Sequence, residues 1–316
     1  MTDLAIIAEG LSKSFSRVQA LNGVDLRLPY GQVLGVLGPN GAGKTTTIRI
    51  LSTLLSPDRG GAEVAGFDVL AQPQLVRRVI GLSGQRVAID EYLTGRENLR
   101  MMGRLSRLGR REAIRRADDL VDLFGLGHAA DRMARTYSGG MRRRLDVAAS
   151  LVVDPIVLFL DEPTTGLDPH GRVGVWQLVR EMVREGTTVL LTTQYLEEAD
   201  QLADRIMLID RGRMVAEGTS SELKSRVGGD RLELWSASPE GIDQLVTAMA
   251  DLGSGPPEVD RDLNRVVLPV ADGPGILAEV GVRLSRARIG VQDLSLRRPT
   301  LDDVFIALTQ RTTDET

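Results

Sequence analysis

Residues 38–45 have the residue types and the spacing of a loop that binds phosphate groups. They fit the pattern G-x-x-x-x-G-K-[ST] at every defined position and read Gly38-Pro39-Asn40-Gly41-Ala42-Gly43-Lys44-Thr45. Glycine allows backbone angles that turn successive N–H groups toward one centre, where they can surround a phosphate. We expect Lys44 to reach the β- and γ-phosphates of a nucleotide and the Thr45 hydroxyl to bind Mg²⁺.

The segments on either side of this loop distinguish it from a plain glycine-rich turn. Residues 32–37 predict a buried strand and residues 46–51 the start of a helix, which is the context that the motif requires. Thr46, at this helix start, is a further expected phosphate-binding residue. Lysine occurs only at positions 13, 44 and 224, and the other basic residues are arginines. A lysine at position 44 of such a chain supports a phosphate site there, because the small ammonium group fits a crowded site better than a guanidinium.

A second candidate site follows an apolar run over residues 156–160, which ends in Asp161, Glu162 and Pro163. Such an unbroken run predicts a strand that is buried on both faces, as in a parallel sheet. At the end of this strand, Asp161 is placed to bind Mg²⁺ through water, and Glu162 to polarise an attacking water. An acidic turn without chemistry is the alternative, and the phosphate loop upstream argues against it.

Between these two motifs, Ser138, Gly139 and Gly140 lead into a helix-like pattern. A small polar triplet at a helix N-terminus presents backbone N–H groups and positive partial charge, both of which favour an anion. Ser-Gly-Gly is common in loops, so the triplet gains its meaning from its place between the other two motifs.

In this order, the motifs resemble those of the nucleotide-binding subunit of an ATP-binding-cassette (ABC) transporter, over about residues 4–220. The resemblance implies an α/β P-loop NTPase fold, with a RecA-like core and a helical subdomain at about residues 90–150. It implies that Glu162 is the catalytic glutamate. It also implies that the signature Ser138-Gly139-Gly140 binds the ATP held by a second copy.

The same resemblance assigns roles to three further residues. Gln85 falls at the Q-loop glutamine, which touches Mg²⁺ and senses the membrane partner, and Asp168 falls in the D-loop. Phe15 lies where an aromatic ring stacks on adenine, although a core phenylalanine is the alternative there.

Two departures from the family pattern are visible. Tyr137 and Met141 flank the signature where leucine and glutamine are usual, which should change the packing and leave the chemistry intact. Gln194 replaces the usual switch histidine, and neither His128 nor His170 falls at that position. An amide can donate a hydrogen bond to the γ-phosphate but cannot carry a proton near neutral pH. We therefore assign the proton handling to Glu162 and water.

The composition is consistent with a transporter subunit. The 316 residues allow a large α/β domain and a smaller one, and the absence of cysteine excludes disulfides. A net charge of −4 gives no footprint for nucleic acid. The first residues lack the positive charges that are typical of a signal peptide, so we expect none. No apolar stretch approaches the roughly 18 residues that are needed to span a bilayer. We expect a homodimer at the cytoplasmic face of the cell membrane, with separate permease subunits.

Two other functions are compatible with these motifs. A nucleotide-gated regulatory module with little turnover is one alternative, and a soluble ABC ATPase of DNA repair or translation is another. An arginine-rich stretch within residues 90–131 has two interpretations as well, a solvated face or a contact with permease loops or anionic lipid. Its arginines are Arg104, Arg107, Arg110, Arg111, Arg115 and Arg116.

The character of the chain changes between residues 220 and 230, which predicts a cassette over 1–222 and an accessory domain over 223–316. Strands are expected at 231–235, 264–270 and 289–296, with helices at 238–250 and 274–286, in a small α+β domain of the split βαβ type. Residues 298–309 resemble the C-terminal domain of daunorubicin/doxorubicin-resistance-type ATPase subunits. This resemblance implies export of a drug, antibiotic or lipid. Locally, Thr300 to Asp303 predict an ordinary capped helix start.

Overall fold

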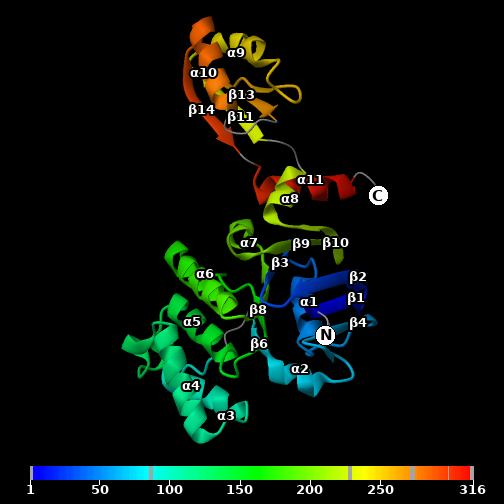
Figure 1. Cartoon of the computed structure of the whole chain (residues 1–316), viewed down its shortest axis with the longest axis vertical. Coiled ribbons are helices and arrows are strands. Elements are labelled where there is room, and N and C mark those ends of the chain that lie inside the picture. The colour runs from blue at the N-terminus through cyan, green and yellow to red at the C-terminus, as the bar shows by residue number, and fades with distance from the viewer. Residues whose placement is uncertain (1–2, 85–87, 227–229, 271–274, 298, 314–316) are drawn as a thin grey trace. The chain divides into compact units, whose positions relative to one another are not determined.

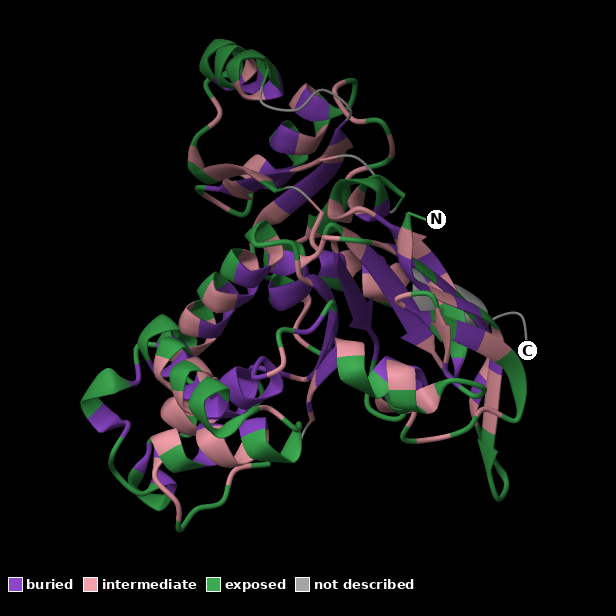
Figure 2. Ribbon diagram, turned by 60° about the horizontal axis from the view of Figure 1, so that its bottom comes forward, coloured by how far each residue is buried: buried purple, intermediate pink, exposed green. Residues whose placement is uncertain are grey.

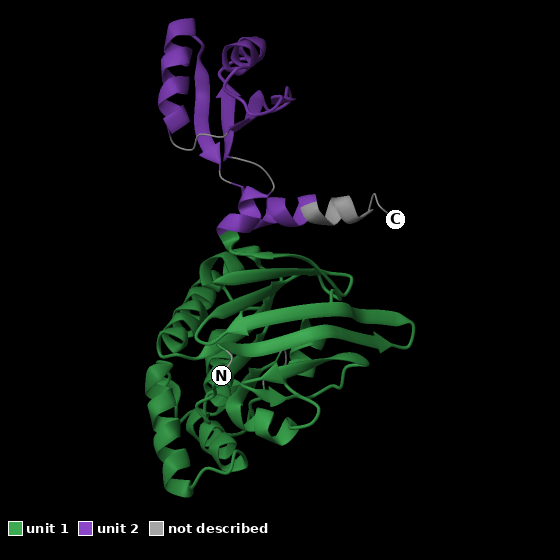
Figure 3. Ribbon diagram, turned by 45° about the vertical axis from the view of Figure 1, so that its right-hand side comes forward, with its two compact units in different colours: residues 1–220 green, residues 221–316 purple. Residues whose placement is uncertain are grey.

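The chain is seen in a computed structural model that describes residues 3–84, 88–226, 230–270, 275–297 and 299–313 (Figure 1). Its contacts divide it into two compact units, residues 1–220 and residues 221–316, which are coloured separately in Figure 3. Among the described residues, none of the helices combines the length and the apolar character that crossing a bilayer requires.

A six-stranded sheet with the order β10-β9-β3-β8-β7-β6 forms the centre of the first unit. Five of its strands are parallel, and β10 runs antiparallel to β9 at the edge. Every residue of β3, β7 and β8 is buried, and β3 and β7 confirm the strands predicted over residues 32–37 and 156–160 (Figure 2). The strands are β3 (Val33–Leu37), β6 (Ile80–Ser83), β7 (Val157–Asp161), β8 (Thr188–Thr193), β9 (Arg205–Asp210) and β10 (Arg213–Gly218).

An antiparallel sheet with the order β2-β1-β4-β5 forms a second layer of this unit. Its strands are β1 (Leu4–Phe15), β2 (Val18–Pro29), β4 (Arg59–Val64) and β5 (Phe67–Asp68). One hydrophobic cluster joins both sheets to helix α1 (Lys44–Leu51), with Leu11 and Leu26 from the outer sheet, Ile48 from α1, and Val36 and Phe159 from the central sheet. This packing fixes the helix that begins with the phosphate loop's lysine.

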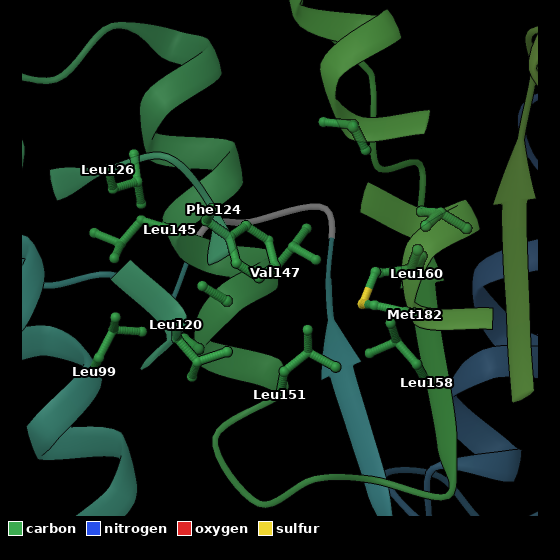
Figure 4. Packing of buried hydrophobic residues seen from close by; sticks show 14 of the residues in the cluster. Leu99, Leu120, Phe124, Leu126, Leu145, Val147, Leu151, Leu158, Leu160 and Met182 are labelled. Carbon is green, nitrogen blue, oxygen red and sulfur yellow. The ribbon is translucent and has the colours of Figure 1, made fainter. Parts of the chain in front are cut away.

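Helices cover the rest of the central sheet. They are α2 (Pro73–Val79), α3 (Gly95–Leu105), α4 (Arg110–Leu123), α5 (Gly139–Ser150), α6 (Pro169–Arg184) and α7 (Leu196–Leu202), with short 3-10 turns at Gly127–Ala129 and Ala134–Thr136. In Figure 4, Leu99 and Phe124 of the α3–α4 region lie in one buried cluster with Leu145 of α5 and Leu158 of β7. The predicted helical subdomain is therefore present, and α5 links it to the sheet.

The second unit is built around a four-stranded antiparallel sheet with the order β12-β13-β11-β14. This order and the two helices confirm the predicted split βαβ arrangement, and Leu232, Leu268, Leu245 and Val280 share its core. Its elements are α8 (Ser220–Ser225), β11 (Asp230–Ser236), α9 (Gly241–Met249), β12 (Glu258–Asp260), β13 (Arg265–Val270), α10 (Gly275–Ala287), β14 (Val291–Arg297) and α11 (Leu301–Thr313).

The predicted cap of α11 is also present. Thr300 N donates to Asp303 Oδ2 at 2.8 Å, and Asp303 N donates back to Thr300 Oγ1 at 3.3 Å. These two bonds satisfy N–H groups that have no partner within the helix. Two details differ from the predictions, since α9 begins three residues later than expected and the short, acidic β12 was not predicted.

Candidate ATP-binding and hydrolysis site

Parallel strands bring the predicted motifs to one edge of the central sheet. The phosphate loop follows β3, Asp161 and Glu162 lie at the end of β7, and Gln194 follows β8. Because these strands run the same way, the segments that leave their carboxyl ends meet at the same place, where open α/β sheets bind their ligands.

Two glycines of the phosphate loop are required by close packing. A Cβ on Gly38 would lie 2.2 Å from the carbonyl oxygen of Ile209, at the end of β9. Gly43 has a φ of +112°, and a Cβ there would lie 2.5 Å from the carbonyl oxygen of Ala20 in β2. The loop is therefore held between β9 and β2, in a backbone conformation that only glycine adopts easily.

The Lys44 side chain lies inside this loop and is only 4% exposed. Its Nζ donates hydrogen bonds to the carbonyls of Gly38 at 2.7 Å and Pro39 at 3.1 Å, and lies 3.7 Å from Glu162 Oε1. Burial lowers the pKa of Lys44, and the carboxylates of Glu162 and Asp161 oppose this shift. The structure thus brings together a lysine and a glutamate that were predicted from separate motifs.

Asp161 is buried beside the Thr45 hydroxyl. Thr45 Oγ1 donates to Asp161 Oδ1 at 3.1 Å, and Thr192 Oγ1 of β8 donates to the same oxygen at 2.6 Å. The described residues contain no group of three or more histidine or acidic side chains that could hold a metal by itself. A hydroxyl and a carboxylate oxygen fit Mg²⁺ nevertheless, because this ion takes few protein ligands and completes its shell with phosphate oxygens and water.

Glu162 is held from two sides in an uncommon backbone conformation. Its φ is +52°, in the left-handed region that residues with a Cβ avoid. Its N–H donates to the carbonyl oxygen of Thr192 at 3.0 Å, and its Oε2 accepts from Thr165 Oγ1 at 3.2 Å. Sequence reasoning gave neither threonine a role. The sequence feature that could have indicated Thr192 is the pair of threonines, Thr192 and Thr193, at the end of the otherwise apolar strand β8.

Ser138 begins helix α5 as its N-cap, and its Oγ accepts from Met141 N at 3.2 Å. A Cβ on Gly139 or Gly140 would meet no atom within 4 Å, so both backbones are open to a ligand. Ser138 and Gly140 line a cavity of about 550 Å³ together with Asp168. A second cavity, of about 750 Å³, is lined by Asn40, Gly41 and Glu162 and also by Gly139 of the signature.

Tyr137, the first departure from the family pattern, is a packing residue. It is 3% exposed, and its hydroxyl donates to the carbonyl of Ala129 at 2.7 Å. A Cβ on Gly95, the first residue of α3, would lie 2.2 Å from this hydroxyl oxygen. The tyrosine therefore depends on glycine at position 95.

The remaining predicted site residues have different surroundings. Gln194 is exposed at the end of β8, and Asp168 is the N-cap of α6, where its Oδ1 accepts from Gly171 N at 2.9 Å. Phe15 is 45% exposed at the end of β1, with Lys13 Nζ 5.9 Å from its ring centre, so it is no core residue. Gln85 lies outside the described residues. Thr46 lies on the first turn of α1 and is half-buried.

The arginine-rich stretch lies on and between α3 and α4. Arg115 pairs with Asp119 on the same helix at 3.2 Å, and Arg116 lies 3.3 Å from Asp154. The other four arginines of the stretch are exposed. Both interpretations, a solvated face and a contact surface, agree with this placement.

Comparison with known proteins identifies the family. The family model described as "ABC transporter" matches residues 21–165. The chain is 54% identical to the daunorubicin resistance ATP-binding protein DrrA2 of Streptomyces coeruleorubidus, over 100% of this chain and 98% of the relative. It is 52% identical to the daunorubicin/doxorubicin resistance ATP-binding protein DrrA of Streptomyces peucetius, over 98% of this chain and 94% of the relative.

A solved structure agrees with this result. The fold is similar to that of cbiO1 from Clostridium perfringens, part of the ABC transporter complex cbiONQ, with a TM-score of 0.64 and 26% identity over 72% of this chain and 95% of that one. Full-length similarity to the resistance proteins also places the second unit within the family. The chain belongs to the daunorubicin/doxorubicin-resistance ATP-binding proteins of the ABC transporter family, as an ATP-hydrolysing exporter subunit that works with membrane components.

Proposed function

We propose that two copies of this chain bind ATP between them and drive the export of a hydrophobic drug or antibiotic through a separate membrane permease. The observation that carries the export role is 54% identity, over the whole chain, to a protein named for daunorubicin resistance. This similarity extends beyond residues 21–165 into the second unit, residues 221–316. A lipid is the second candidate cargo. The working position is the cytoplasmic face of the membrane, against the permease.

The units have separate tasks in this proposal. The cassette, residues 1–222, binds and hydrolyses ATP, and the accessory domain, residues 223–316, serves the assembly with the permease or the second copy. The family resemblance of residues 298–309 supports this division, as does the change of fold after Ser220.

Within each site, the backbone of residues 38–45 and Lys44 bind the phosphates. Thr45 and Asp161 would hold Mg²⁺, with Gln85 as a further contact that rests on the resemblance. Mg²⁺, when bound, neutralises charge on the β- and γ-phosphate oxygens. Glu162 orients the attacking water and accepts its proton, and Gln194 donates a hydrogen bond to the γ-phosphate. The distance of 3.7 Å between Lys44 Nζ and Glu162 Oε1 supports this pairing of phosphate binding and water activation.

The placement of the signature supports a site shared by two copies. Ser138 and Gly140 line a cavity whose lining includes no residue of the phosphate loop. Gly139 lines that cavity and also the one lined by Asn40, Gly41 and Glu162. In a head-to-tail dimer, the signature of one copy would close over the nucleotide held by the other. Binding of ATP would then favour the closed dimer, and hydrolysis would release it, in step with two states of the permease.

The hydrolysis part of this proposal is tested by Glu162→Gln. We expect this variant to bind ATP with a Kd within about threefold of wild type while its turnover falls by a factor of about 10³ or more, because the amide cannot accept the proton. Turnover at the wild-type rate would contradict the role of Glu162. The alternative function, a nucleotide-gated regulatory module, was suggested by Gln194 in place of the switch histidine. It predicts that the wild-type chain itself hydrolyses little ATP.

The export part requires the membrane protein that co-purifies with the chain in detergent. We expect cells that express both to accumulate less daunorubicin than cells that express the membrane protein with the Glu162→Gln variant. Equal accumulation in the two strains would contradict export of this drug. The same cells loaded with a fluorescent lipid would then test the second candidate cargo.

A further inference from the structure

A buried guanidinium on α5 contacts the backbone on both sides of Glu162. The Arg143 residue is only 5% exposed. Its Nε donates to the carbonyl oxygen of Pro163 at 2.7 Å, and its Nη2 donates to the carbonyl oxygen of Asp161 at 3.2 Å. These carbonyls belong to the residues immediately before and after Glu162.

The backbone between these two carbonyls is the strained one. A residue with a Cβ stays in the left-handed region only when its surroundings hold it there. For Glu162, the N–H is held by Thr192 of β8, and the flanking carbonyls are held by Arg143 of α5. The direction of the Glu162 side chain toward Lys44 therefore depends on contacts from two different elements.

Arg143 is joined to a buried carboxylate one turn further along α5. Asp146 is 3% exposed, and its Oδ2 lies 3.2 Å from Arg143 Nη1. The same carboxylate accepts from Ser83 Oγ at 2.6 Å and from Ala88 N at 2.8 Å. Arg143 Nη1 also donates to the carbonyl of Gly84 at 2.8 Å. The pair thus contacts the chain on both sides of residues 85–87, the segment that contains Gln85.

Stability alone is a weak reason for such a pair. Burial lowers the pKa of Arg143 and raises that of Asp146, and the attraction between the two charges opposes both shifts. A buried ion pair often contributes no more to stability than packed apolar side chains do. A guanidinium offers five N–H donors in a fixed planar fork, which lets one side chain hold several carbonyls in a set geometry. Lysine offers a single point of charge instead.

We propose that Arg143 and Asp146 are positioning residues for ATP hydrolysis. Arg143 fixes the Asp161–Pro163 backbone so that the Glu162 carboxylate stays beside Lys44. Through Asp146, the same fork ties this turn to both sides of the Gln85 segment, which the family resemblance assigns to sensing the membrane partner. The proposal rests on the proposed catalytic role of Glu162.

The first test compares Arg143→Lys with Arg115→Lys in the full-length chain. Arg115 is an exposed arginine on α4 that pairs with Asp119 of its own helix, so it is a matched control. We expect Arg143→Lys to lower kcat by about ten- to a hundredfold and to leave the Kd for ATP within about threefold. Asp146→Asn should show the same separation of kcat from Kd. An unchanged kcat would overturn the proposal. So would a fall in the measured rate that is matched by an equal fall in the fraction of protein that binds ATP, because misfolding alone would then explain it.

The second test does not require turnover. Glycine adopts a positive φ without strain, so Glu162→Gly keeps the backbone conformation but removes the strain against which Arg143 is proposed to hold it. We expect Arg143→Lys to lower the Tm more in a Glu162→Gly background than in a Glu162→Gln background, because only in the second does loss of the guanidinium allow a strained backbone to relax. Equal Tm losses in the two backgrounds would contradict the positioning role. Failure of Glu162→Gln to affect turnover would instead contradict the proposed function.

Discussion

At the scale of single residues, Glu198 of α7 illustrates how burial changes a carboxyl group near the site. It is fully buried, and Trp176 Nε1 donates to its Oε1 at 3.1 Å. Burial raises the pKa of Glu198, although hydrogen bonds and the charge of Arg143 oppose the shift. The folded chain therefore holds this proton more tightly than the unfolded chain does.

A pH dependence of stability follows from that shift. The contribution of Glu198 is fully present below its unfolded-state pKa and is lost as the pH rises through the higher folded-state pKa, at about 1.4 kcal/mol per pH unit. We expect Glu198→Gln to gain stability relative to wild type as the pH rises from 5 to 8. Urea unfolding at several pH values measures this difference. A difference that does not change with pH would contradict the raised pKa.

A second residue-scale prediction concerns Gly95 and Tyr137. Gly95→Ala would place a Cβ 2.2 Å from the Tyr137 hydroxyl oxygen, so we expect a loss of about 2 kcal/mol. Tyr137→Phe removes that oxygen and should restore part of the stability of Gly95→Ala, although Tyr137→Phe alone costs about 1 kcal/mol. The four proteins of this double-mutant cycle are compared by urea unfolding. Gly281→Ala, on an exposed and open position of α10, is the control. Additive effects would exclude the predicted contact.

The site illustrates what the sequence could and could not predict at this scale. Motif spacing placed Lys44, Thr45, Asp161 and Glu162 at one site, and the structure brings them within hydrogen-bonding or ion-pair distance. Nothing in the sequence indicated a role for Arg143, because a run of three consecutive arginines is typical of a solvated surface. Its burial depends on tertiary contacts of α5 with the carbonyls of Gly84, Asp161 and Pro163, which no local pattern encodes.

At the scale of elements, helix α3 fixes the segment that precedes it. Asn98 is fully buried, and its side chain donates to the carbonyl of Asp90 at 2.9 Å and accepts from Asp90 N at 2.8 Å. Asn98→Leu would leave both backbone groups of Asp90 without this partner, so we expect a loss of about 2–4 kcal/mol. Gln244→Leu, on the exposed face of α9, is the matched control and should change stability little. A loss of less than about 1 kcal/mol for Asn98→Leu would contradict the anchoring role.

Elements were predictable where a continuous apolar run identifies them. Strands β3 and β7, which are buried throughout, and strands β11, β13 and β14 of the second unit were predicted within one or two residues. The three residues of β12 carry two acidic side chains, and their strand conformation comes from pairing with β13. The outer sheet of the first unit was not predicted.

At the scale of the whole molecule, the account depends on two copies acting together. Glu162 lines one cavity and Ser138 lines another, while Gly139 of the signature lines both. A single copy would then hold the hydrolytic half of one site and the signature half of another. Ser138→Arg should therefore abolish turnover without affecting the phosphate loop of its own copy.

The most direct test of this central claim is to mix two inactive variants, Ser138→Arg and Glu162→Gln, and to measure ATP hydrolysis. In a mixed dimer, one site combines the intact Glu162 of the first variant with the intact Ser138 of the second. The account predicts that mixing restores turnover, up to about a quarter of the wild-type rate if copies pair at random and sites act independently. If mixed dimers form and hydrolyse ATP no faster than either variant alone, the site is not shared between copies.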